Sequence, residues 1–389
     1  MEHLEDIWNK LTENGFKIST DTRGDVSRSV FFGIKGENFD GSTYGQEALE
    51  KGAVLAVTDN ALEILQKLAR RYRDTFDIPV VAIGGSNGKT TTRELTRCVL
   101  ETKYHTYTTK ENLNNHLGVP LSIFALDKSA EIAVFEIGAN HQGEHLELLE
   151  ILHPTHVLVT NNGLDHLEGF GSPEGVELAN KEIIDWAEEQ GKVVIHKMPI
   201  NLEKTSSLPL TLRYEDSEYK TQLFGDYNLE NIISALSIGQ EFGLDTKESL
   251  EAITHYSPTL KRSQLVEKDG TKIILDCYNA NPTSLRLALE SFISSAVPPR
   301  AVVLGDMLEL GDYSDHYHRE ILEYLAKQNI ERTILVGENF KKTLEYVTLK
   351  SLWFESSEKA REWFTEEDWK DWTVLVKGSR GMRLEKVVE

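Results

Sequence analysis

The chain has 389 residues, of which 40% are hydrophobic and 27% are charged. This is the composition of a globular protein with room for about two or three domains. The formal net charge of −21 argues against nucleic-acid binding, which needs a basic face. No apolar run reaches the length of about 18 residues that a membrane span needs. The acidic start of the chain lacks the features of a signal peptide, and the two cysteines lie in apolar stretches, so we expect a cytoplasmic protein with free thiols.

The first informative segment is a glycine-rich turn at residues 84–92, which follows an apolar run at 78–83 and precedes a helix-type run. A strand, a glycine turn and a helix start in this order direct backbone N–H groups at an anion. Here Lys89 can reach the outer phosphates of a nucleotide, and the Thr90 hydroxyl can hold Mg²⁺. Ile83 stands where the full Walker pattern has its first glycine, so the match is partial. The alternative is an ordinary polar turn before a helix.

Short, nearly all-apolar runs alternate with polar helix-type segments along most of the chain. Such runs are typical of parallel strands that are covered on both faces, so the expected fold class is α/β. Charged or proline-containing segments at 70–74 and 257–261 suggest domains at residues 1–76, 77–260 and 261–389. The later expected strands are residues 132–136, 156–160, 192–195, 272–276, 301–305, 333–337 and 373–377.

Polar residues stand at the ends of two of these strands, where α/β folds place their ligands. Glu136 is well placed to hold Mg²⁺, although it could equally cap a neighbouring loop. His166, next to Asp165, could bind a metal or transfer a proton, but a single histidine is more often structural. Lys181 lies in a helix-type run, and its position alone indicates a surface lysine.

Two amide-rich loops could contact polar ligands. The loop at 112–115 suits a polar ligand but also suits turn capping. The loop at 279–281 follows a strand and enters a helix, so its side chains could cap that helix or contact a nucleotide. A further small turn at 377–380 also suits an anion. The amides of the two loops are Asn112, Asn114, Asn115, Asn279 and Asn281.

Together these segments resemble the Mur ligase family over nearly the whole chain. Residues 85–91 resemble that family's variant phosphate loop, which also lacks the first Walker glycine. Residues 278–282 and 305–311 resemble the segments that distinguish the member adding a dipeptide from its sister ligases. The other similar segments are residues 112–120, 136–144 and 166–172 and, near the start of the chain, 21–23, 31–36 and 40–41.

The resemblance implies a monomeric ligase of peptidoglycan synthesis that uses ATP and Mg²⁺. Its partners would be UDP-N-acetylmuramoyl-tripeptide and D-alanyl-D-alanine, which it would join through an acyl phosphate. The implied fold has three α/β domains: a small UDP-binding domain, a central phosphate-loop domain with a parallel sheet, and a Rossmann-like C-terminal domain. A sister ligase that adds a single amino acid, or glutamate to folate, is one alternative. A non-catalytic nucleotide-binding protein is another.

The resemblance also implies roles for individual residues. The catalytic residues would be Lys89, His166 and Lys181, and CO₂ would carbamylate Lys181 into an anion that helps to organise the metal ions. The metal ligands would be Thr90, Glu136, His166 and Lys181. The nucleotide would contact Gly85, Asn87, Gly88, Lys89, Thr90, Thr91, Asn228, Arg262 and Asp276. The other substrates would contact Thr22, Arg23, Asn112, Asn114, Asn115, Asn279 and Asn281.

Three residues depart from the family pattern: Glu111 replaces a usual glycine, Tyr227 a usual histidine, and Lys261 a frequent glycine. These changes bear on adenine contacts and domain closure and leave the phosphate and metal residues in place. The span from 195 to 225 is short for the family, which predicts that part of an extra sheet is missing.

Overall fold

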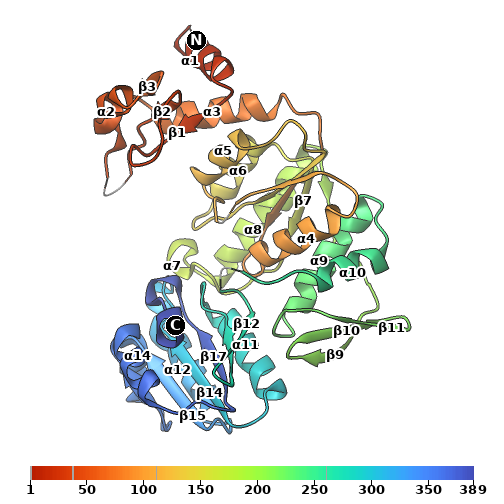
Figure 1. Ribbon diagram of the computed structural model, residues 1–389, viewed down its shortest axis with the longest axis vertical. Helices are drawn as coiled ribbons and strands as arrows, with labels where there is room; N and C mark the ends of the chain where they lie inside the picture. Colours follow the sequence, from red (N-terminus) through yellow and green to blue (C-terminus); the bar gives the residue numbers. More distant parts are fainter. Residues whose placement is uncertain (1, 37–38, 111, 260) are drawn as a thin grey trace.

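The computed structural model describes residues 2–36, 39–110, 112–259 and 261–389, and Glu111 therefore lies outside the described residues. Three α/β layers follow one another along the long axis of the molecule (Figure 1). The N-terminal layer has a parallel sheet in the order β1-β2-β3. Its elements are α1 (Glu2–Glu13), β1 (Ile18–Ser19), β2 (Val30–Phe32), η1 (Gly41–Tyr44), α2 (Gly45–Glu50), β3 (Leu55–Val57) and α3 (Ala61–Arg73).

The central layer is built on a five-stranded parallel sheet in the order β5-β6-β4-β7-β8. The middle strand β4 (Val80–Gly84) is buried along its whole length, because helices cover both faces of the sheet. The alternating side chains of this strand enter two separate cores. The other elements are α4 (Lys89–Leu100), β5 (Thr106–Thr108), α5 (Gly118–Phe124), β6 (Ile132–Glu136), α6 (Glu144–Leu152), β7 (His156–Val159), α7 (Leu167–Phe170), α8 (Pro173–Glu189) and β8 (Val193–Val194).

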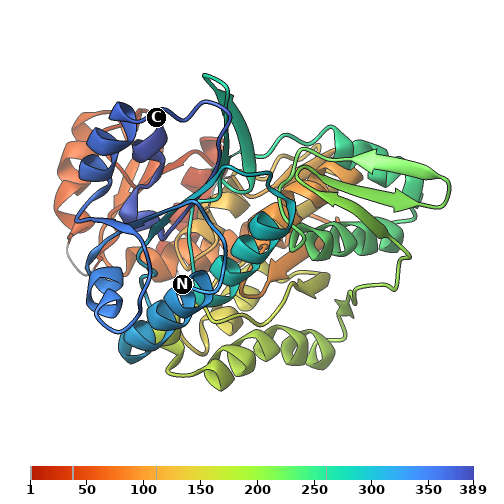
Figure 2. The ribbon, with the colours of Figure 1, turned by 90° about the horizontal axis from the view of Figure 1, so that it is seen from below.

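The central layer also carries a small antiparallel sheet and two helices. The sheet has the order β11-β10-β9, and in the view from below it projects to one side, away from the C-terminal elements (Figure 2). The short span after residue 195 therefore still forms three strands. These elements are β9 (Glu203–Ser207), β10 (Leu210–Tyr214), β11 (Ser217–Lys220), α9 (Asn228–Glu241) and α10 (Thr246–Thr254).

The C-terminal layer is a six-stranded sheet in the order β12-β13-β17-β14-β15-β16, parallel except for β12. The β12–β13 hairpin turns at Asp269 and Gly270, both with positive φ, which is the geometry that an Asp-Gly hairpin turn favours. The elements are β12 (Gln264–Lys268), β13 (Thr271–Leu275), α11 (Pro282–Ser295), β14 (Arg300–Gly305), η2 (Gly311–Tyr313), α12 (Ser314–Leu325), β15 (Arg332–Val336), α13 (Glu338–Leu344), β16 (Leu352–Phe354), α14 (Ser357–Glu366), β17 (Thr373–Lys377), η3 (Arg380–Met382) and α15 (Glu385–Val388).

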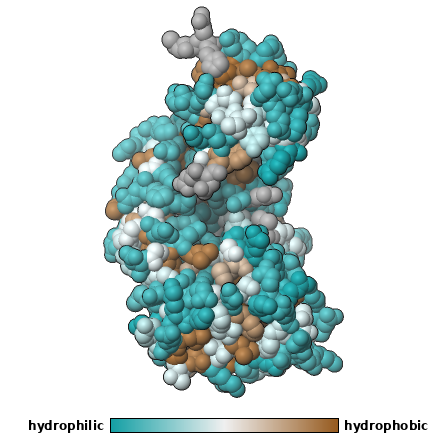
Figure 3. All heavy atoms as spheres, turned by 90° about the vertical axis from the view of Figure 1, so that its left-hand side faces the viewer, coloured by the Kyte–Doolittle hydropathy of each residue, from teal (hydrophilic) through white to brown (hydrophobic). Residues whose placement is uncertain are grey.

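The outer surface and the helices show what kind of solvent contact this fold has. Hydrophilic residues cover most of the face seen in Figure 3, and apolar residues form only small patches there. Among the described helices, none combines the length and the apolar character that crossing a membrane requires. The predicted α/β class with parallel sheets is confirmed, and all eight expected strands match observed strands to within two residues at each end.

Candidate active site

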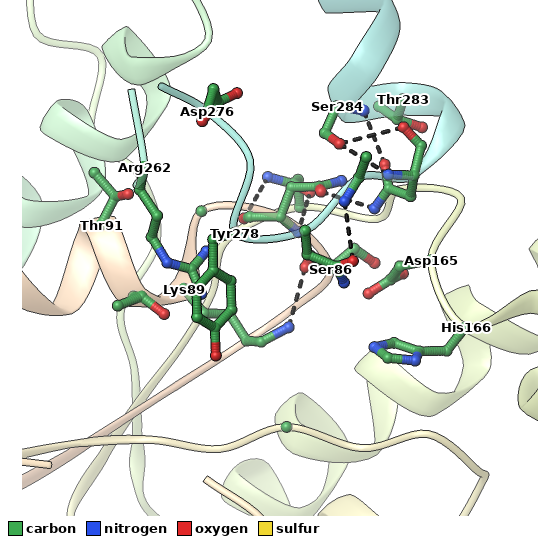
Figure 4. A pocket seen from close by; sticks show the side chains of 18 of the residues that line it. Ser86, Lys89, Thr91, Asp165, His166, Arg262, Asp276, Tyr278, Thr283 and Ser284 are labelled. Atoms are coloured by element: carbon green, nitrogen blue, oxygen red, sulfur yellow. Dashed lines mark hydrogen bonds between the residues drawn. The ribbon is translucent and has the colours of Figure 1, made fainter. Parts of the chain in front are cut away.

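A cavity of about 820 Å³ lies between the central and C-terminal layers. The phosphate loop, the amide loop at 112–115 and the ends of β6 and β7 form its central-layer wall. The loops that follow β13 and β17 form the opposite wall. Because the carboxyl ends of parallel strands meet at one edge of a sheet, both sheets direct their polar loops into the same space. Figure 4 shows side chains from both layers around this cavity.

The phosphate loop adopts the conformation that its glycines predict. Gly85 and Gly88 have φ of +107° and +83°, which favour glycine, and a Cβ atom at Gly88 would collide with the Asn231 side chain. Lys89 Nζ donates to the carbonyl oxygens of Gly85 at 2.6 Å and Ser86 at 3.0 Å, so the ammonium group lies over the loop. The loop and the following helix α4 thus place a cation and a helix N-terminus at one point, which suits an anion.

The tip of the loop is tied to both sides of the cavity through Asn87. The Asn161 side chain accepts from the Asn87 backbone N–H at 3.0 Å and donates to the Asn87 carbonyl oxygen at 3.0 Å. From the C-terminal layer, Asn281 Nδ2 donates to Asn87 Oδ1 at 2.8 Å. Asn281 also caps helix α11 in a capping box with Ser284. Asn281 therefore caps the helix, as one interpretation of the 279–281 loop predicts, and its amide also reaches the phosphate loop.

Thr90 and Glu136 form an oxygen-rich pair that fits Mg²⁺. Thr90 Oγ1 donates to Glu136 Oε2 at 2.8 Å, and Asn114 Nδ2 donates to Glu136 Oε1 at 2.8 Å. Glu136 is 2% exposed and ends the buried strand β6. In the described part of the chain, no three His, Cys, Asp or Glu side chains gather closely enough to hold a metal ion. A hydroxyl and one carboxylate are the donors expected where phosphates and water supply the other magnesium ligands.

His166 lines the same cavity as Glu136 but has a partner in the other layer. Its Nδ1 atom lies 2.9 Å from Glu309 Oε2, an ion pair if the imidazole is protonated. The hydrogen bond with His166 lowers the pKa of the Glu309 carboxyl. Asp165, beside His166 in Figure 4, also lines the cavity, and its Oδ1 atom is buried with no hydrogen-bond partner among the described residues.

The placement of Lys181 at this site is wrong. Its side chain is 59% exposed, and its Nζ atom pairs with both carboxylate oxygens of Asp185 at 2.5 Å. Helix α8 buries residues at 175, 176, 179, 180 and 183 against the protein, and Lys181 lies off this stripe. Its position in the sequence alone predicts a surface lysine, and the structure agrees with that alternative. The residues present do not fit a carbamate at Lys181.

Asp276 is the centre of a buried polar cluster behind the cavity. Lys377 Nζ donates to Asp276 Oδ2 at 2.7 Å, and the Ser263 backbone N–H donates to Asp276 Oδ1 at 2.9 Å. Burial alone would raise the pKa of the Asp276 carboxyl, but Lys377 and these donors lower it. Tyr227 donates to Asp276 at 3.2 Å, and burial raises the pKa of its phenol. The tyrosine that departs from the family pattern thus has a structural role here.

Two other nucleotide candidates stand beside this cluster. Arg262 stacks its guanidinium 3.7 Å above the Tyr278 ring, and both residues line the cavity (Figure 4). Asn228 is 1% exposed and donates to the Phe224 carbonyl oxygen at 2.7 Å and to Ser263 Oγ at 3.0 Å. Lys261 instead pairs with Glu385 and Glu389.

The residues predicted for substrate binding divide between two places. Five of them line the main cavity: Asn112, Asn114, Asn115, Asn279 and Asn281. Thr22 and Arg23 lie in the N-terminal layer and are not among the lining residues. Thr22 is buried, and Arg23 pairs with Asp21 at 2.6 Å.

Sequence reasoning missed Asn231 and the burial of His145. Asn231 lies one turn after Asn228 on α9, and Thr92 Oγ1 donates to it at 3.3 Å, so a second amide three residues on was the available signal. His145 is 2% exposed, and its Nδ1 atom lies 2.9 Å from the Ala179 carbonyl oxygen. Burial lowers the pKa of His145 to about 4. Nothing in its sequence context distinguishes it from an exposed histidine.

Comparison with known families accounts for this arrangement. Residues 83–206 match the Mur ligase middle domain, and residues 261–380 match the Mur ligase glutamate ligase domain. The chain is 30% identical to a protein of Escherichia coli (strain K12) over 95% of this chain and 92% of that protein. The chain therefore belongs to the Mur ligase family, has its three-domain fold, and is an ATP-dependent ligase.

The particular relatives share one name. The Escherichia coli protein is a UDP-N-acetylmuramoyl-tripeptide–D-alanyl-D-alanine ligase. So is a protein of Bacillus subtilis (strain 168), 29% identical over 96% of this chain and 92% of that protein. Among solved structures, MurF from Acinetobacter baumannii is 25% identical with a TM-score of 0.85, covering 98% of this chain and 97% of that one. MurF ligase from Thermotoga maritima in complex with ADP is 25% identical with a TM-score of 0.82, covering 96% of each chain.

Proposed function

We propose that this protein joins D-alanyl-D-alanine to UDP-N-acetylmuramoyl-tripeptide and converts ATP to ADP and phosphate. The observation that carries the proposal is the bridge from Asn281 to Asn87, at 2.8 Å. It connects the loop that distinguishes the dipeptide-adding member directly to the phosphate loop. Asn281, which would contact the incoming amine, and Asn87, which would contact the phosphates of ATP, would thus be hydrogen-bonded to each other. The relatives that match nearly the whole chain support the same reaction.

The reaction has two bond-forming steps. A carboxylate oxygen of the tripeptide attacks the γ-phosphorus of ATP, the bond to the β-phosphate oxygen breaks, and ADP leaves. The resulting acyl phosphate is attacked at its carbonyl carbon by the free amine of the dipeptide. The tetrahedral intermediate collapses, phosphate leaves with the former carboxylate oxygen, and the nitrogen loses a proton as the amide forms.

The residues of the phosphate loop perform the electrostatic part of this chemistry. An anionic carboxylate must approach anionic phosphates, so positive groups fixed in advance have to offset the repulsion. Lys89 and the N-terminus of α4 supply such groups, and Lys89 is already held over the loop. We assign Thr90 and Glu136 to Mg²⁺, which supplies further charge neutralisation when it is bound. His166 also belongs to this proposal, through an imidazole that would have to leave Glu309.

We assign the three layers to three tasks, with domains at residues 1–76, 77–260 and 261–389. The first would grip the UDP-sugar with Thr22 and Arg23, and the second would bind ATP. The third would bring the dipeptide and contribute Arg262 and Asp276 beside the nucleotide. Closing the cavity would keep water from the acyl phosphate. We also propose that the protein is a monomer and that it acts in the cytoplasm.

Phosphate release measures the proposed reaction and separates it from its alternatives. Purified protein receives ATP, Mg²⁺ and the UDP-tripeptide, with D-alanyl-D-alanine, single amino acids or glutamate as the acceptor. We expect phosphate release that depends on both the muropeptide and the dipeptide. Release with a single amino acid would instead support a sister ligase. Nucleotide binding without release under any condition would support a non-catalytic protein. Muropeptides with diaminopimelate or lysine as the third residue identify the donor.

A further inference from the structure

None of the described residues that line the cavity is a lysine in a state that CO₂ could carbamylate. Among its lining residues in the described chain, the lysines are Lys89 and Lys377. Lys89 Nζ donates to two carbonyl oxygens, and Lys377 Nζ donates to the Asp276 carboxylate at 2.7 Å. A carbamate would place anionic oxygens on these nitrogens, against the oxygens that now accept from them. That repulsion, and the loss of the ammonium charge, favour the uncarbamylated form at both positions.

The helix that carries Lys181 presents a different residue to the phosphate loop. Successive residues of a helix point about 100° apart, so the neighbour of an exposed lysine can face inward. That neighbour is Asn180, which is 4% exposed. Its Nδ2 atom donates to Ser86 Oγ at 3.3 Å and to Asn162 Oδ1 at 2.9 Å. Asn180 is neutral, so it fixes the position of these two loops but does not supply the negative charge of a carbamate.

Asp165 supplies a negative charge in the loop that Asn180 holds through Asn162. It follows Asn162 in the same loop and is 7% exposed, and its carboxylate lines the cavity. The loop is fixed at three points. The Ser86 N–H donates to the Asn161 carbonyl oxygen at 2.9 Å, the Leu164 N–H donates to Thr283 Oγ1 at 3.1 Å, and Asn180 holds Asn162.

The Asp165 carboxylate is also incompletely satisfied. Its Oδ1 atom is buried with no hydrogen-bond partner among the described residues. A buried carboxylate oxygen without a partner is unfavourable unless a donor or cation joins it. In a cavity that binds a nucleotide with Mg²⁺, the hydrated cation provides such a partner, because carboxylate oxygens are the ligands it prefers.

We propose that this ligase works without a lysine carbamate, and that Asp165 supplies the fixed negative charge toward the nucleotide-bound cation while Asn180 positions its loop. The proposal rests on the proposed function for its metal and nucleotide. Asp165 acts on the cation, directly or through its water, and Asn180 acts only through Asn162 and Ser86. Lys181 and Asp185 form a surface ion pair outside this machinery.

Nucleotide binding tests the proposal independently of ligation. Titration calorimetry measures the affinity for ADP with and without Mg²⁺ in wild type, Asp165→Asn, Asn180→Ala, Lys181→Ala and Asp185→Asn. We expect Asp165→Asn to weaken binding with Mg²⁺ by about tenfold or more, the usual value of one charged contact, and to leave metal-free ADP binding unchanged or tighter. Asn180→Ala should shift the Mg²⁺ dependence in the same direction. Lys181→Ala and the matched control Asp185→Asn should stay within about twofold of wild type.

Carbon-13 NMR tests the missing carbamate directly. Wild-type protein equilibrated with ¹³C-bicarbonate should show no lysine carbamate signal, and ligation should not depend on added bicarbonate. A carbamate signal that disappears in Lys181→Ala would overturn the proposal, as would unchanged Mg²⁺-dependent affinity in Asp165→Asn. Metal-free ADP binding reports whether each variant is folded. If wild type binds ADP with Mg²⁺ but ligates no dipeptide, the proposed function fails. Calorimetry of Asp165→Asn then still tests the contact between Asp165 and the cation.

Discussion

Replacing Lys377 by methionine should destabilise the C-terminal domain, because it leaves the Asp276 carboxylate buried without its cation. The two side chains are 4% and 11% exposed, and their charged atoms lie 2.7 Å apart. Breaking a buried pair from one side costs about 3 to 5 kcal/mol. Asp276 keeps its bonds from Ser263 and Tyr227, so we expect the lower end, about 3 kcal/mol. The double variant Asp276→Asn/Lys377→Met should recover at least about 1 kcal/mol, because it removes the unpaired charge.

Urea unfolding followed by tryptophan fluorescence measures this loss. Four of the six tryptophans report on the C-terminal domain: Trp353, Trp363, Trp369 and Trp372. The matched control is Lys359→Met, which removes an exposed ion pair with Glu362 in the same domain and should change stability by less than about 0.5 kcal/mol. If Lys377→Met unfolds with the same midpoint as Lys359→Met, or if the double variant is no more stable than Lys377→Met, then the argument from buried charge is refuted.

Three further predictions concern the central domain. Lys89→Ala should reduce the ligation rate by at least about 100-fold with an unchanged circular dichroism spectrum, and near-normal turnover would refute the phosphate-loop assignment. Glu136→Gln should raise the Mg²⁺ concentration for half-maximal ADP binding by about tenfold, and an unchanged Mg²⁺ titration would remove Glu136 from the metal site. For His145, the folded pKa of about 4 is depressed from 6.5, so its stabilising contribution is present above pH 6.5 and is lost as the pH falls toward 4. Wild type should therefore lose about 2 kcal/mol more than His145→Gln between pH 7.5 and 5 in urea unfolding, and parallel losses would contradict the assigned burial effect.

The sequence predicted the parts of the fold that depend on local patterns. The strand β6 spans the expected residues, because a short, nearly all-apolar run between helices is typical of a buried parallel strand in an α/β fold. The helix-type run at 91–100 after the phosphate loop forms a helix that begins two residues earlier, at Lys89. Short or polar strands were missed. Residues 203–207, for example, form β9 although Glu203 and Lys204 lie within it, because pairing with β10 and not local hydrophobicity fixes that strand.

The candidate site also contains some residues that the sequence predicts and others that it does not. The phosphate loop and Glu136 were predictable, because backbone geometry and strand position determine what they do. The resemblance alone places Lys181 at the site, but the residue of helix α8 that faces inward is its neighbour Asn180, and Lys181 faces the solvent. The Asn281–Asn87 bridge and the burial of His145 depend on how two distant segments pack, which a single sequence does not specify.

Transfer of oxygen-18 tests the central claim most directly. The substrate is UDP-N-acetylmuramoyl-tripeptide labelled with ¹⁸O at both oxygens of its terminal carboxylate. It is incubated with the protein, ATP, Mg²⁺ and D-alanyl-D-alanine, and mass spectrometry measures the ¹⁸O content of the products. The acyl-phosphate route predicts one ¹⁸O in each released phosphate and one ¹⁸O left in the new amide, with no release when the dipeptide is omitted. Unlabelled phosphate, or labelled phosphate without the dipeptide-extended product, would contradict the account.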